Sequence, residues 1–74
     1  MNEEVLTLDE KQNIARQFIK NLAYSRYNVQ VSLIAENAVV PPNQSNIDSF
    51  TKQLADIDAK IAAVEAELAT MEGE

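Results

Sequence analysis

The feature that most constrains the fold is a series of apolar residues in the second half of the chain, spaced alternately by three and four. Its members are Ile47, Phe50, Leu54, Ile57, Ile61, Val64, Leu68 and Met71. This alternation keeps the side chains on one face of an α-helix and is typical of a helix that packs lengthwise against another. We therefore predict a helix over about 46–72, with its intrachain seam running from Phe50 to Leu68.

The flanks of this helix suggest how it begins and ends. Ser45 or Asn46 is expected to be its N-cap, because short polar side chains accept hydrogen bonds from the first free backbone N–H groups. Asp48 then suits the positive end of the helix dipole. Gly73 is a plausible C-terminal cap.

The outer side of the same helix has both charged and apolar patterns. Asp48 and Lys52, and likewise Asp56 and Lys60, have the spacing of favourable ion pairs one turn apart. Five alanines share a face: Ala55, Ala59, Ala62, Ala66 and Ala69. Alanine favours helices at solvent-exposed positions, yet so smooth a face could also admit a second helix closely. Both interpretations stay open.

The first half of the chain predicts a second long helix. Thr7 followed by Glu10 fits a capping box, and no glycine or proline follows before Pro41. A helix over about 8–38 is therefore expected. Consecutive prolines cannot lie inside a helix, so the Pro-rich segment 39–46 is expected to be the turn.

This first helix has two apolar stripes. The first contains Leu8, Ala15, Ile19, Leu22, Val29 and Leu33, with Arg26 among them. The second, nearly opposite, contains Tyr24, Tyr27, Val31, Ile34 and Ala38. A helix that is apolar on two sides is usually covered on two sides. We interpret the second stripe as an interaction face, although the sequence leaves open which stripe packs against the other helix.

The simplest fold is an all-α, antiparallel two-helix hairpin resembling a coiled coil, forming one domain over residues 1–74. In such a hairpin Arg26 lies level with about position 59, so Asp58 or Asp56 is its expected partner. The segment 27–33 also alternates with the period of a β-strand, but the chain offers that strand no convincing partner.

The small size of the chain predicts that it needs a partner. It has 74 residues and no cysteine or histidine, so neither disulfides nor a Cys/His zinc site can reinforce a thin core. We expect assembly into an oligomeric bundle with other copies of itself, or docking on a larger particle protein.

The residue types argue against catalysis. Nucleophilic triads need histidine or an equivalent base, and no glycine-rich loop is present to bind phosphate. We therefore expect no enzyme activity, no cofactor or metal and no small-molecule substrate. No apolar run approaches membrane-spanning length and no secretory signal is recognisable, so a soluble, non-secreted protein is expected.

The charge of the chain bears on its partners. Six basic and twelve acidic residues give a net charge of −6, which argues against nucleic-acid binding and against an anionic membrane surface. Rows of carboxylates on the second helix could instead imitate a phosphate backbone. An acidic inhibitor of a host nucleic-acid enzyme, of the anti-restriction or anti-CRISPR type, is therefore the alternative function.

Two segments resemble known small proteins. The sequence over 27–39 leading into the Pro-Asn turn, followed by that over 55–68, is similar to small helical proteins of tailed bacteriophages. The resemblance implies a virion or accessory protein, located in the virion or in the cytoplasm of a bacterial host, with no functional residues to transfer. Type III secretion needle subunits are hairpins of similar length, but their usual second proline in the turn motif is missing after Pro42.

Overall fold

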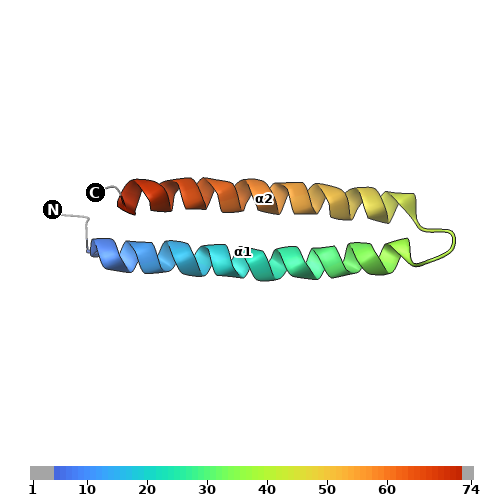
Figure 1. The fold of residues 1–74 in the computed structure, drawn as a ribbon, viewed down its shortest axis with the longest axis horizontal. Helices are drawn as coiled ribbons and strands as arrows, with labels where there is room; N and C mark the ends of the chain where they lie inside the picture. Colours follow the sequence, from blue (N-terminus) through green and yellow to red (C-terminus); the bar gives the residue numbers. More distant parts are fainter. Residues whose placement is uncertain (1–4, 73–74) are drawn as a thin grey trace.

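The computed structural model describes residues 5–72, which form an antiparallel pair of helices (Figure 1). Helix α1 spans Leu8–Asn37 and helix α2 spans Gln44–Glu72. The described chain is 87% helical and has no strand, so the all-α hairpin is confirmed. Segment 27–33 lies inside α1, and the strand alternative for it is wrong.

The hairpin is a thin rod rather than a compact domain. It measures 59 × 23 × 14 Å, with a Cα radius of gyration of 17.1 Å. A compact chain of this length would have a radius of about 11 Å. Each helix packs against one other helix, so the only buried hydrophobic residues in the described range are Ala15 and Met71.

The capping box predicted at the start of α1 is confirmed. Thr7 Oγ1 accepts a hydrogen bond from the Glu10 backbone N–H at 3.1 Å, and the Thr7 N–H donates to Glu10 Oε1 at 2.8 Å. These two bonds satisfy donors that have no partner within the helix. The bond from the Thr7 backbone, with that from its side chain, lowers the pKa of Glu10.

The start of α2 differs from the sequence prediction. Neither Ser45 nor Asn46 is its N-cap, because the helix begins two residues earlier than expected, at Gln44. Asn43 Oδ1 accepts from the Asn46 N–H at 3.2 Å, and the Asn43 carbonyl accepts the first helical bond from Ile47. Asn43 follows Pro42 directly, so the connection is confined to residues 38–43 and includes a cis Val40–Pro41 peptide bond. The predicted C-cap, Gly73, lies outside the described residues.

The two ion pairs predicted within α2 are also wrong. Lys52 Nζ contacts Asp56 Oδ2 at 3.1 Å, whereas Asp48 accepts from the Gln44 amide at 2.9 Å. Starting at Gln44 moves Asp48 out of the first turn of the helix. Lys52 is exposed and has an acid one turn away in either direction, Asp48 and Asp56. Because exposed ion pairs contribute little free energy, the two pairings of Lys52 differ little in stability.

The side of each helix that faces the other is now defined. All eight members of the α2 apolar series are buried or half-buried. On α1 the matching series of buried or half-buried positions is Gln12, Ala15, Ile19, Leu22, Arg26, Val29, Leu33 and Glu36. The first stripe of α1 therefore packs against α2, although Leu8 at its end is exposed. Gln12 and Glu36 extend this series, and they were not predicted because polar residues add nothing to a pattern of apolar spacing.

Candidate interaction surface

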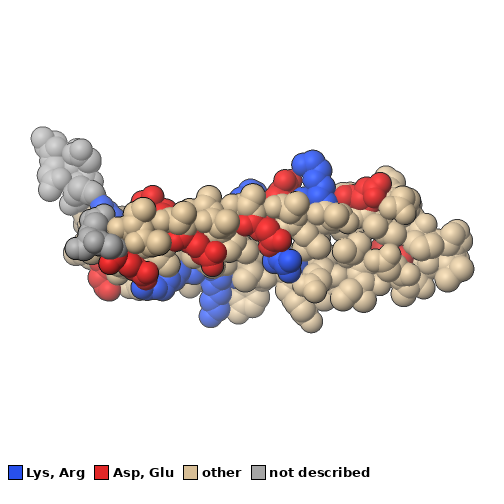
Figure 2. Space-filling model, turned by 45° about the horizontal axis from the view of Figure 1, so that its top comes forward, with Lys and Arg blue, Asp and Glu red and all other residues tan. Residues whose placement is uncertain are grey.

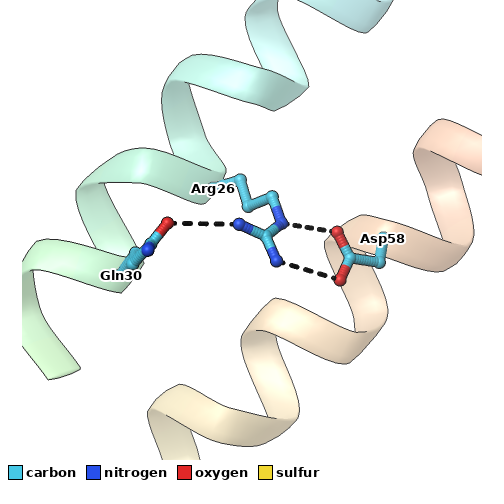
Figure 3. A network of polar contacts seen from close by, with 3 residues as sticks. All are labelled: Arg26, Gln30 and Asp58. Atoms are coloured by element: carbon cyan, nitrogen blue, oxygen red, sulfur yellow. Dashed lines mark hydrogen bonds and ion pairs between the residues drawn. The ribbon is translucent and has the colours of Figure 1, made fainter.

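Arg26 joins the two helices near the middle of the rod (Figure 3). Its Nε lies 2.6 Å from Asp58 Oδ1 and its Nη2 lies 3.3 Å from Asp58 Oδ2, which confirms the predicted partner. The remaining Nη1 donates to Gln30 Oε1 at 3.2 Å, one turn further along α1. A planar guanidinium held by two oxygens fixes orientation as well as distance.

This contact changes the acidity of both partners. The hydrogen bond from Arg26 is the main cause that lowers the pKa of Asp58. The same hydrogen bond, reinforced by the charge of Asp58, raises the pKa of Arg26. Both groups are therefore charged at neutral pH, and their charges are directed at each other.

Three further polar contacts hold the two ends of the hairpin. Near the termini, Arg16 Nη2 lies 3.1 Å from Glu72 Oε2. At the turn, the Glu36 carboxylate accepts from the Asn43 N–H at 3.1 Å and from the Asn46 side-chain amide at 3.2 Å. An acid at the N-terminus of α2 is favourable for the helix dipole. Contacts at three levels thus set the register of the two helices.

The second stripe of α1 lies away from this seam. Tyr24 is 62% exposed, Tyr27 66%, Val31 44% and Ile34 62%, and Ala38 is also exposed. Their spacing of three and four repeats the pattern of a helix-packing seam. We call these five residues the tyrosine stripe, and no part of the described chain covers it.

The tyrosine stripe continues into the turn. Val39 is 50% exposed and Val40 is 92% exposed. Both valines were predicted to lie in the turn and not on the apolar surface. The signal was present, since two adjacent valines before two prolines are unusual in a solvent-exposed turn.

The surface around the tyrosine stripe is almost free of charge. Between Asn21 and Ile47 the only charged residues are Arg26 and Glu36. Arg26 contacts Asp58, and Glu36 accepts from the side-chain amide of Asn46 at the start of α2. Figure 2 shows the contrast: charged side chains gather over α2 and toward the termini, whereas the turn end is mostly uncharged.

A smaller apolar patch lies on the first half of α1. Ile14 is 55% exposed and Phe18 is 52% exposed, one helical turn apart. Neither residue was predicted to lie in a stripe, although a large apolar pair at this spacing is a sufficient signal. Lys11 and Asn21 flank the pair one turn to either side, so it is a separate feature from the tyrosine stripe.

The alanine face of α2 is exposed as well, on the side opposite its seam. It differs from the tyrosine stripe in its surroundings. The acidic residues on the same helix are Asp48, Asp56, Asp58, Glu65, Glu67 and Glu72. Alanine side chains also bury little area, so this face offers less apolar contact than the tyrosine stripe.

The rest of the described chain offers no competing site. Residues 5–72 form no detectable pocket and no group of three or more side chains suited to bind a metal ion. Within that range neither helix has a stretch long and apolar enough to cross a membrane. Comparison with protein-family models, curated proteins and solved structures finds no match to this chain. The tyrosine stripe is therefore the strongest candidate site on chemical grounds alone.

Proposed function

We propose that this protein is a non-enzymatic structural or interaction protein, a helical hairpin that assembles with other proteins through its apolar faces. The observation that supports this most directly is the exposed tyrosine stripe in uncharged surroundings. Protein interfaces are enriched in tyrosine and depleted in charge at their centres. A tyrosine can bury its ring on a partner while its hydroxyl stays in water.

The thin core gives a second reason. With only Ala15 and Met71 buried, the isolated hairpin has little apolar burial to offset the entropy of ordering two long helices. A partner that binds only the folded chain stabilises it by mass action. Assembly thus serves the stability of the hairpin as well as its role.

The proposed setting is a bacteriophage particle or its assembly pathway, in the virion or the cytoplasm of the bacterial host. This rests on the resemblance of segments 27–39 and 55–68 to small helical proteins of tailed phages. Other copies of the chain or a larger particle protein are the proposed partners. No cofactor, metal, nucleic acid, membrane or small-molecule substrate is part of this role.

An acidic inhibitor of a host nucleic-acid enzyme is the alternative. It is favoured by the acids that line α2, among them Asp56, Asp58 and Glu65, and by the net charge of −6. Such an inhibitor would bind a basic protein through α2, and its affinity would fall steeply with added salt. Binding through the tyrosine stripe would depend little on salt.

The experiment is light scattering coupled to gel filtration, on the chain alone and with candidate particle proteins. Wild-type complexes should be lost in Tyr27→Asp, which places a charge in the tyrosine stripe. The matched control is Ala62→Asp, which places the same charge at an exposed position of α2, and its complexes should persist. Complexes that persist in both variants and weaken steeply with added salt would favour the inhibitor instead.

A further inference from the structure

We propose that two copies of the hairpin pair through their tyrosine stripes, antiparallel, about a two-fold axis that passes between Val31 and Ile34. This inference rests on the proposed function and adds the partner, the orientation and the register. It follows from the order of residue sizes along the stripe and from the distribution of charge over the hairpin.

The size order favours an antiparallel pair. The largest side chains of the stripe, Tyr24 and Tyr27, lie at one end and the smallest, Ala38, lies at the other. In the antiparallel register, Tyr27 of each copy faces Ala38 of the other, and Val31 faces Ile34. A large residue opposite a small one fills space evenly, whereas a parallel pair would set tyrosine on tyrosine and alanine on alanine.

The same register covers the exposed turn. Tyr24 of one copy then lies level with Pro41 of the other, beside Val40, which is 92% exposed in the single hairpin. The overlap runs from Tyr24 to the end of α1 at Asn37, about 20 Å of helix, and continues over the turn. An interface of this length lies at the small end of the range for specific complexes, so the dimer should be weak and depend on concentration.

The distribution of charge allows a second copy to bind on the tyrosine stripe. Each chain has a net charge of −6, so two copies repel unless their acids stay apart. Because α2 packs on the opposite side of α1, the layer order in the dimer is α2, α1, α1, α2. The two α2 helices are then about 25–30 Å apart, three helix spacings, and salt screens charges over about 8–10 Å.

The alanine face of α2 fits a second copy less well. Pairing there would bring α2 against α2 and set Asp56, Asp58 and Glu65 of one chain close to the same acids of the other. Like charges held in contact are destabilising. Of the two exposed helix faces, only the tyrosine stripe lets identical acidic chains approach closely.

Cysteine pairing tests the register, because the chain has no cysteine of its own. Tyr27→Cys and Ala38→Cys are made as separate variants, and both positions are exposed in the single hairpin. On oxidation, a mixture of the two should form a covalent heterodimer, while each variant alone should stay uncrosslinked. Ala62→Cys mixed with either variant is the matched control and should give no heterodimer. Circular dichroism of the reduced variants checks that the hairpin is retained.

Each other outcome has a distinct meaning. Efficient crosslinking of Tyr27→Cys alone, or of Ala38→Cys alone, would overturn the antiparallel register. Absence of the heterodimer while the wild type sediments as a dimer would overturn the stripe-to-stripe contact but leave the proposed assembly function intact. A wild type that is monomeric at every concentration, yet binds a particle protein through Tyr27, would overturn the second copy as partner. Salt provides a further readout, because raising it should leave the wild-type dimer unchanged or strengthened.

Discussion

Arg26 is the residue whose position in the fold most needs an explanation. It occupies a seam position in α1 that neighbouring turns give to Leu22 and Val29. Its aliphatic stem packs along the seam while its guanidinium reaches Asp58, so it stays half-buried without an unpaired charge. A single polar residue in an apolar seam weakens packing but specifies which residues pair. Arg26 and Asp58 therefore act mainly on register.

The lowered pKa of Asp58 predicts how stability changes with pH. A folded-state pKa below that of the unfolded chain means that the contact stabilises the hairpin above about pH 4. That stabilisation is lost as the pH falls through the folded pKa. The denaturation midpoint of Asp58→Asn should therefore lie below the wild-type midpoint near neutral pH, and the two should converge in acid.

The matched control for this pH dependence is Asp56→Asn. Asp56 pairs only with Lys52 on its own helix, so its loss leaves the contact between the helices intact. Urea denaturation followed by circular dichroism, at several pH values, gives the midpoints. The contradicting result is an Asp58→Asn midpoint that stays a constant distance below the wild-type midpoint down to strong acid. That result would show that the charge of the Asp58 carboxylate does not stabilise the hairpin.

At the scale of the helices, the α2 seam determines whether the hairpin folds. Ile61→Ala removes half-buried methyl groups from this seam, and its cost should fall near the lower end of the 2–5 kcal/mol range known for buried isoleucine, or about 2 kcal/mol. Ile34→Ala is the matched change in the tyrosine stripe, and in dilute solution it should have little effect. Urea midpoints compare the two. Equal destabilisation in dilute solution would mean that Ile34 is covered within one chain.

The sequence was sufficient to predict both helices, but not the N-cap of α2 or the ion pairs on its surface. The spacing of the α2 series and the capping box at Thr7 are local patterns with few competing structures. The start of α2 was predicted two residues too late because Asn43, Ser45 and Asn46 can all cap a helix. Which of them is the N-cap depends on the residue at which the turn ends. The Lys52 pairing was misjudged because its alternatives differ by little free energy.

The candidate site was predictable only in part. The tyrosine stripe was visible in the sequence, but α1 has two apolar stripes, and a helix sequence alone does not say which one meets α2. What distinguishes them is the polar pairing of Arg26 and Glu36 with α2, which requires both helices to be placed. Ile14 and Phe18 were missed because they belong to neither stripe.

At the scale of the whole molecule, charge is distributed unevenly over the rod. The termini and α2 carry most of the charged residues, including the contact between Arg16 and Glu72, whereas the turn and the tyrosine stripe on α1 are nearly free of charge. This division would serve the proposed assembly. Net charge would keep free chains apart in solution, and the uncharged tyrosine stripe would let two copies meet.

The most direct test of this account is the thermal midpoint of the wild-type chain measured at increasing protein concentration. Association of folded chains predicts that the midpoint rises with concentration. In Ile34→Asp the midpoint should be independent of concentration, while Ala62→Asp should behave as wild type. A wild-type chain that melts cooperatively at one temperature over the whole concentration range would contradict the account, because the hairpin would then need no partner to cover its tyrosine stripe.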